Sequence, residues 1–328
     1  DLLYDEVRVV QGNADSRETY EQVQADQSRF VVANNGDVTN TNATLTVREV
    51  APEVPIGAII ENDDSQDILE LSGATHVLPI KRWLGEQLAN RVNAQHAELH
   101  SVGQYRSLRL AELPVHNTPL ERETIREAGL RETFGVTVAG VWERGLFHPA
   151  HPDYTLQPSS VPVVVGTKEQ LRALNERISP YDENPHPVLV IGGGTVGGAA
   201  VQALSERGVD VHLVERQPER CRALDPHCEK VFCGDASDYT LLRDAGVEAA
   251  PSVLLTTNDD AINIYLASYF LRLDLDLRVV SRITHERNLE AIHRAGADFV
   301  LSYVTLGAEA VYSAIKGRRL VVLGEGVD

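Results

Sequence analysis

Methionine is absent from this chain, and aromatic residues make up only 5% of its 328 residues. Long hydrophobic runs are also missing. The longest, such as Val161–Val165 and Val188–Ile191, are far shorter than the roughly 20 residues of a membrane-spanning helix. The three cysteines, Cys221, Cys228 and Cys233, lack a Cys-x-x-Cys spacing. We therefore expect three reduced thiols, with neither a disulfide nor a zinc site.

Positive charge is scarce as well. Thirty Lys and Arg residues stand against 48 Asp and Glu residues, which gives a formal net charge of −18. Binding to phosphate backbones needs a basic face, so this balance argues against a nucleic-acid partner. It is typical of a soluble cytoplasmic protein, or of one that attracts cations.

The chain contains a long-period repeat. The segments 9–15, 29–35 and 71–78 are matched in order and spacing by 231–237, 251–258 and 294–301. The first copy lacks the part that precedes Lys230 in the second, so the chain would begin inside a domain, with Val7–Val10 as its third strand. This start and the lack of methionine predict an excerpt of a longer polypeptide.

The second copy alternates short apolar strands with helical patterns. Strands are expected at 187–192, 209–215, 230–233, 252–256, 278–282 and 298–301, with helices between them. Such alternation predicts a parallel, doubly wound sheet. Long amphipathic helices, Lys81–Gln95 and Leu306–Ile315, would close the two copies.

A different, β-rich module punctuated by prolines lies between the copies, at about 99–178. It would hold strands at 107–110, 136–142 and 161–165 and a helix at 168–178, followed by a linker at 179–187. The predicted fold class is therefore α/β, with two Rossmann-like doubly wound lobes and a smaller α+β lobe between them. The expected boundaries are 1–97, 98–180, 181–316 and a truncated further module at 317–328, opening with a strand at 320–324.

A glycine motif falls between the first strand and first helix of the second copy. Gly192 would permit a tight turn, Gly194 would let a pyrophosphate approach the backbone, and Gly197 would let helix and strand pack closely. The helix N-terminus that follows, at Thr195 and Val196, offers N–H groups to phosphates. The acidic Glu215 ends the next strand and can accept hydrogen bonds from ribose hydroxyls, which favours NAD or an adenosine nucleotide over NADP.

Other polar residues follow the third and fourth strands of this copy. Asp235 would lie near the adenine edge, although it can also simply form a turn. Thr257 and Asn258 end the fourth strand at the crevice where such sheets bind ligands. Asn258 or Asp259 can equally serve as a helix cap.

A catalytic set is not evident beside this motif. His148 and His151 lie in a proline-rich turn and are expected in a surface loop. The acidic pairs Asp63–Asp64 and Asp259–Asp260 could hold a divalent cation, but solvated turns are the simpler interpretation. We expect no catalytic residues and no resident metal.

The order of these motifs, from the glycine loop through Gly234-Asp235-Ala236 and Thr257-Asn258-Asp259-Asp260 to Arg294-Ala295-Gly296-Ala297-Asp298, resembles the RCK domain (regulator of K⁺ conductance, also called KTN). The middle module, with Val136–Val141 and Val161–Gly166, is similar to the RCK C-terminal lobe. The family forms gating rings of potassium channels and regulatory subunits of Trk-type potassium uptake systems.

This resemblance implies a nucleotide, NAD or ADP/ATP, as regulatory ligand, with Ca²⁺ as a further possibility. By motif match the cofactor-binding residues would be Gly192, Gly194, Thr195, Val196, Gly197, Glu215, Arg216, Asp235, Ala236, Thr257, Asn258 and Arg282. Arg282 stands where some members place an arginine on phosphate across a pair of domains. In the first copy Ile59 or a neighbour takes that place.

The resemblance also implies the cytoplasmic, ligand-sensing part of a potassium channel at the membrane, which self-associates into a gating ring of four tandem units. The pore domain would lie outside this sequence or on a partner subunit. One alternative is a regulatory NAD-binding subunit of a Trk-type uptake system. Another is an NAD-dependent dehydrogenase, which would need an acid or base facing the nicotinamide.

Overall fold

The structure is a computed structural model that describes residues 9–92, 100–105, 107–113, 115, 118–143, 146–158, 160–178, 186–273 and 277–317. The chain divides into two compact units. The first unit is Asp1–Ile80 with Gly307–Leu320, and the second is Lys81–Leu306 with Val321–Asp328. Among the helices in these ranges, none is both long and apolar enough to cross a membrane.

The first unit contains a three-stranded parallel sheet in the order β1-β2-β3. Its core packs α2 and α3 against the sheet through small and branched apolar side chains. The elements are α1 (Arg17–Gln22), β1 (Val31–Ala33), α2 (Asp37–Val50), β2 (Ile56–Ile59), α3 (Gln66–Leu71), β3 (His76–Leu78) and most of α13 (Tyr303–Lys316). Of the strand predicted at Val7–Val10, Val9 and Val10 are not in a strand, and Val7 and Arg8 lie outside the described residues.

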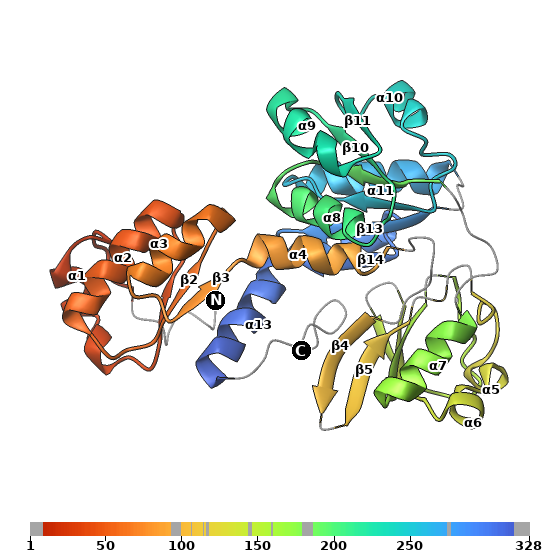
Figure 1. Cartoon of the computed structure of the whole chain (residues 1–328), viewed down its shortest axis with the longest axis horizontal. Helices are drawn as coiled ribbons and strands as arrows, with labels where there is room; N and C mark the ends of the chain where they lie inside the picture. The colour runs from red at the N-terminus through yellow and green to blue at the C-terminus, as the bar shows by residue number, and fades with distance from the viewer. Residues whose placement is uncertain are drawn as a thin grey trace. The chain divides into compact units, whose positions relative to one another are not determined.

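The second unit holds a six-stranded, all-parallel sheet in the order β11-β10-β9-β12-β13-β14. Helices α8 to α11 surround this sheet (Figure 1). Its strands are β9 (Val188–Ile191), β10 (Val211–Glu215), β11 (Lys230–Cys233), β12 (Ser252–Leu255), β13 (Arg278–Ile283) and β14 (Phe299–Ser302). Its helices are α8 (Thr195–Ser205), α9 (Pro218–Leu224), α10 (Tyr239–Asp244), α11 (Asp260–Arg272) and α12 (Leu289–Arg294).

Burial explains why these strands are short and apolar. Every residue of β9, β12, β13 and β14 is buried, as expected for strands covered by helices on both faces. The strand order reverses between β9 and β12. In doubly wound sheets this reversal opens a crevice at the carboxyl ends of the strands, where ligands bind.

The second unit also contains a five-stranded antiparallel sheet in the order β4-β5-β8-β6-β7. A separate apolar core supports it. The elements are α4 (Ile80–Ala89), β4 (His100–Tyr105), β5 (Leu108–Glu112), α5 (Ile125–Ala128), α6 (Leu130–Phe134), β6 (Thr137–Glu143), β7 (Leu146–Pro149), β8 (Val161–Gly166) and α7 (Lys168–Ile178). Short 3₁₀ helices connect elements elsewhere: η1 (Ala25–Gln27), η2 (Asp63–Ser65), η3 (Asp225–His227) and η4 (Glu286–Asn288).

The sequence repeat is also a repeat of side-chain contacts. Asn40 on α2 donates from Nδ2 to the carbonyl oxygen of Ile59 at 2.7 Å, and Asn263 on α11 donates in the same way to Arg282 at 3.2 Å. Both asparagines are buried, with at most 1% of their surface exposed. Ile59 therefore occupies the place of Arg282 in the first unit.

A carboxylate at the start of each of these helices repeats a second contact pattern. Asp37 and Asp260 each accept hydrogen bonds from two consecutive backbone N–H groups after the next strand and from one side chain beyond them. The donors are Glu61, Asn62 and Ser65 in the first unit, and Thr284, His285 and Asn288 in the second. The two copies thus share these hydrogen bonds as well as the order of their strands.

The predicted fold class is confirmed. The strand at 230–233 and the helix at 168–178 have the predicted bounds, and β9 lies within the predicted strand 187–192. The predicted helix 81–95 is shorter in the described residues, where α4 ends at Ala89, and β4, β7, α5 and α6 were not predicted. The predicted strand 320–324 and the linker residues 179–185 lie outside the described residues.

Candidate functional site

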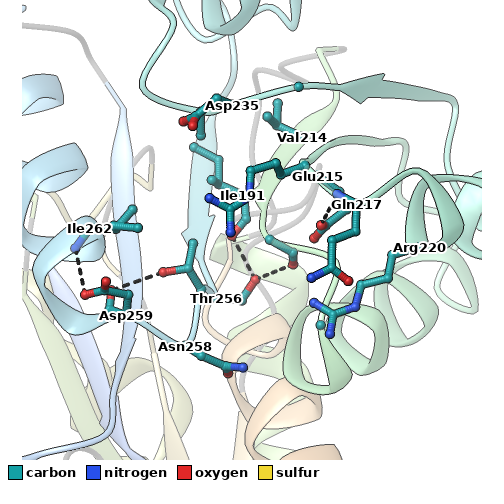
Figure 2. A pocket seen from close by; sticks show the side chains of 16 residues that line it. Ile191, Val214, Glu215, Gln217, Arg220, Asp235, Thr256, Asn258, Asp259 and Ile262 are labelled. Atoms are coloured by element: carbon teal, nitrogen blue, oxygen red, sulfur yellow. Dashed lines mark hydrogen bonds between the residues drawn. The ribbon is translucent and has the colours of Figure 1, made fainter.

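A cavity of about 380 Å³ opens at the carboxyl ends of β9, β10, β11 and β12. The first turns of α8, α9 and α11 border it. Figure 2 shows Glu215, Gln217 and Arg220 on one side and Asp259 and Ile262 on the other. The lining residues are Ile191, Gly192, Gly194, Val214, Glu215, Arg216, Gln217, Arg220, Gly234, Asp235, Ala236, Thr256, Thr257, Asn258, Asp259 and Ile262.

The glycine loop is shaped by two close approaches within the protein. Gly192 has a φ of +103°, and a Cβ there would lie 3.1 Å from the backbone nitrogen of Thr257. A Cβ on Gly197 would lie 1.8 Å from the carbonyl oxygen of Gly192, so α8 can pack on β9 only with glycine there. These two glycines therefore serve the fold itself.

Gly194 differs from both of them. A Cβ there would meet only a guanidinium nitrogen of Arg220, at 3.6 Å, so the protein itself leaves room at this position. Gly194 is also the N-cap residue of α8 and provides no side-chain cap for its N-terminal N–H groups. Such an N-terminus favours an anion, through its N–H groups and through the helix dipole.

Glu215 is buried, and its carboxylate binds backbone. Oε2 accepts a hydrogen bond from Gly193 N at 2.5 Å, and Oε1 accepts one from Gln217 N at 2.6 Å. Glu215 thus fixes the glycine loop against the end of β10. Each carboxylate oxygen retains lone-pair capacity for a further donor such as a hydroxyl.

Arg220 is a lining residue that the sequence reasoning missed. It lies on α9, exposed, with a guanidinium nitrogen beside Gly194. A guanidinium next to an uncapped helix N-terminus is well suited to a phosphate, which it can bind through two N–H groups. The sequence could have indicated Arg220 only by its place near the start of the helix that follows Glu215. Its position beside the glycine loop depends on how the chain folds.

Asp235 forms a turn and lines the cavity at the same time. Its Oδ1 accepts hydrogen bonds from Ser237 N at 2.9 Å and from Ser237 Oγ at 2.8 Å. These bonds, with a smaller contribution from the charge of Arg216, hold the pKa of Asp235 below its usual value. Asp235 therefore remains an ionised acceptor at neutral pH.

The residues after β12 are arranged by hydrogen bonds to the sheet and to α11. Thr257 Oγ1 donates to Asn263 Oδ1 at 2.7 Å, and Asp259 caps α11 by accepting from Ala261 N at 2.9 Å. Asn258 Oδ1 accepts from Arg282 Nη1 at 2.7 Å. Of the alternatives left open by the sequence, the helix cap is Asp259.

The structure brings eight of the predicted residues to the cavity wall: Gly192, Gly194, Glu215, Arg216, Asp235, Ala236, Thr257 and Asn258. Thr195, Val196, Gly197 and Arg282 are not among its lining residues. Val196 and Arg282 are buried, with 2% and 4% of their surface exposed. Arg282 lies behind Asn258, and Thr284 accepts a hydrogen bond from its Nη2.

The expectation of three reduced thiols is wrong for two of the cysteines. Cys221 on α9 and Cys233 at the end of β11 form a disulfide, with their Cα atoms 6.1 Å apart. The chain reversal between α9 and β11 brings them within bridging distance, although 12 residues separate them in sequence. Cys228 is the free cysteine among the described residues.

Of the acidic pairs considered as cation sites, Asp259–Asp260 has protein partners, and Asp63–Asp64 lies in η2. Asp259 caps a helix, and the carboxylate of Asp260 accepts the three hydrogen bonds given above. Within the described ranges, no group of three or more His, Cys, Asp or Glu residues could hold a metal ion. The expected surface loop is wrong for His148, which lies in strand β7, whereas the exposed His151 lies outside any strand, two residues after β7 ends.

A doubly wound sheet, a glycine loop before an uncapped helix and an acidic residue ending the second strand define a Rossmann-type nucleotide-binding lobe. Residues 1–79 and 188–303 match the TrkA-N domain, and residues 110–179 match the TrkA-C domain. The chain therefore belongs to the TrkA-N family of RCK proteins, with a TrkA-C domain between its two TrkA-N segments.

Two solved structures are similar over nearly the whole chain. One is described as the GsuK RCK domain, at 33% identity and a TM-score of 0.75, covering 96% of this chain and 69% of that chain. The other is described as the GsuK channel bound to NAD, at 34% identity and a TM-score of 0.74, covering 96% of this chain and 57% of that one.

Curated relatives are similar over shorter stretches. The Trk system potassium uptake protein TrkA homolog of Archaeoglobus fulgidus is 23% identical over 193 residues, 58% of this chain and 43% of that protein. TrkA of Mycobacterium tuberculosis is 31% identical over 140 residues, 42% of this chain and 63% of that protein. This chain thus spans less than two thirds of either relative.

Proposed function

We propose that this chain is the ligand-sensing regulatory region of a potassium channel, at the cytoplasmic face of the membrane. An adenine nucleotide of the NAD or ADP type would bind in the cavity of the second unit. The pore domain would lie outside this sequence or on a partner subunit, and four tandem units would assemble into a gating ring. The proposal includes the predicted domain boundaries after residues 97, 180 and 316.

The observation that carries the proposal is the opening of an uncapped helix N-terminus, at Gly194, beside the guanidinium of Arg220. Together they offer a diphosphate both N–H donors and a positive charge. The carboxylates of Glu215 and Asp235 supply acceptors for ribose hydroxyls and for an adenine amino group. The structural similarity to a channel described as bound to NAD supports the same assignment.

A regulatory role accounts for the carboxylates of the site better than catalysis does. Those of Glu215, Asp235 and Asp259 each accept backbone N–H groups that fix the surrounding loops. A proton acceptor for hydride chemistry would instead need to reach the substrate. We therefore propose a binding switch rather than a dehydrogenase, and a redox turnover assay with NADH separates the two.

Nucleotide would act by favouring one of two arrangements of the ring. A ligand shifts such an equilibrium only by its difference in affinity for the two states. The alternative, a regulatory subunit of a Trk-type uptake system, shares the fold but not a covalent pore. A selectivity-filter sequence upstream would distinguish them. Calcium remains a separate prediction, to be tested by titration of the same chain with Ca²⁺.

Calorimetry with ADP and NAD on wild type and Gly194→Asp tests the proposal. The substitution adds a carboxylate where the phosphates would bind, and a Cβ has room there, so we expect the fold to persist and binding to be abolished. Gly307→Asp is the matched control, because it adds the same charge on α13, where the nearest side-chain atom, on Ile80, is 3.9 Å from a Cβ. Unchanged affinity in Gly194→Asp would reject the site.

A further inference from the structure

The disulfide between Cys221 and Cys233 lies directly beside the nucleotide pocket. Arg220 immediately precedes one cysteine, and Gly234, Asp235 and Ala236 immediately follow the other, and all four line the cavity. The bridge therefore joins the two segments that form one wall of the pocket, at the point where each segment meets it.

The bridge is also tied to the carboxylate strand of the site. Cys233 is paired in register with Glu215 on the neighbouring strand. The sulfur of Cys221 lies 3.3 Å from the carbonyl oxygen of Glu215, so a thiol there could donate to that oxygen after reduction. Both redox forms are thus compatible with the local backbone.

The two sulfurs differ in access. Cys221 is buried, with 6% of its surface exposed, whereas Cys233 is exposed. Thiol–disulfide exchange requires a thiolate to reach one sulfur, so attack from solvent is directed to Cys233. Cys228 is half-buried, and burial together with the charge of Asp225 raises its pKa to about 11. It is protonated at neutral pH and is a poor internal nucleophile.

We propose that Cys233 is a thiol-exchange site at which low-molecular-weight thiols release a covalent clamp on the nucleotide pocket. A thiolate attacks Cys233 Sγ, the Cys221–Cys233 bond breaks, and Cys221 leaves as a thiolate that takes up a proton. A mixed disulfide then stands on Cys233. A second thiol attacks this adduct, which leaves two protein thiols and one oxidised small-molecule disulfide.

This inference rests on the proposed function, because the proposed cytoplasmic location would expose the disulfide to reducing thiols. Disulfides in reducing compartments are usually transient or redox-sensing. While the bridge is closed, α9 is held to β11 and Arg220 stays beside Gly194. Once the disulfide is reduced, only non-covalent contacts hold α9 in the pocket wall. The pocket then binds phosphate less tightly.

The test uses the full chain, oxidised or reduced with dithiothreitol, with ADP affinity from calorimetry and amide exchange of residues 216–224 and 234–236 from mass spectrometry. We expect reduction to weaken ADP binding about fivefold and to speed exchange in both segments. Cys228→Ser should respond like wild type. The double variant Cys221→Ser/Cys233→Ser should show the reduced behaviour under both conditions.

Peptide mapping after treatment with glutathione should place the adduct on Cys233. An adduct on Cys228 alone, no Cys221–Cys233 bridge in the oxidised chain, or identical ADP affinity in both redox states would overturn the proposal. If ADP and NAD bind in neither state, the proposed function fails, and the clamp is then judged by amide exchange alone. Equal exchange in both states would reject it.

Discussion

Arg282 Nη1 donates a hydrogen bond to Asn258 Oδ1 at 2.7 Å, which links a buried side chain of β13 to a side chain on the wall of the candidate pocket. The guanidinium also contacts Thr284. Burial lowers the pKa of Arg282, and the charge of Asp260 opposes this shift. We therefore predict that Arg282 acts through Asn258 as a positioning residue for the proposed nucleotide.

Replacing Arg282 by isoleucine, the residue of the equivalent position in the first unit, tests this role. We expect ADP affinity to fall about three- to tenfold, because Asn258 loses the donor that orients it. The effects of Arg282→Ile and Asn258→Ala should not add, since contacting residues typically couple by about 0.5–3 kcal/mol. Calorimetry on both single variants and the double variant measures the coupling, and additive losses would contradict the relay through Asn258.

Arg220 should discriminate phosphorylated ligands from nucleosides. A charge-assisted hydrogen bond contributes about 1.5–3 kcal/mol, so we expect Arg220→Gln to weaken ADP at least about tenfold. Adenosine binding should change little. Arg222→Gln is the control, since it removes the same charge from an exposed position on α9 outside the pocket lining. An equal loss for adenosine would show that Arg220 holds the fold of the wall and not the phosphates.

Asp260 should make the stability of the second unit depend on pH. Burial raises its pKa, but hydrogen bonds from Asn288, Thr284 and His285 outweigh this and hold the pKa below the usual value. A carboxyl with a depressed pKa in the folded state stabilises the fold above its unfolded pKa of about 3.9, and this contribution is lost as pH falls through the folded value.

We therefore measure the melting temperature from about pH 7 down to about pH 3. We expect it to decrease once the pH is lower than about 5, and to decrease less steeply in Asp260→Asn. Asp259→Asn is the control, because asparagine caps a helix as well as aspartate does. Parallel pH profiles for wild type and Asp260→Asn would count against this account of Asp260.

Much of the fold could be predicted because its signals are local. The strand β11 is a short apolar run and α7 has a clear helical periodicity, so their bounds were predicted correctly, and β9 was predicted to within one residue at each end. β4 and β7 were missed because edge strands of an antiparallel sheet carry a weaker apolar pattern. The site was predicted where a motif marks it, at the glycine loop and Glu215.

By itself, the sequence determined the duplication, the parallel sheet and the place of the candidate pocket, since these follow from periodicity, strand length and glycine spacing. Only the tertiary structure decided that Arg220 lies beside Gly194, that Arg282 lies behind the pocket-lining Asn258 without lining the pocket itself, and that Cys221 meets Cys233. Each of these depends on how segments far apart in the chain approach one another, and no local propensity specifies that distance.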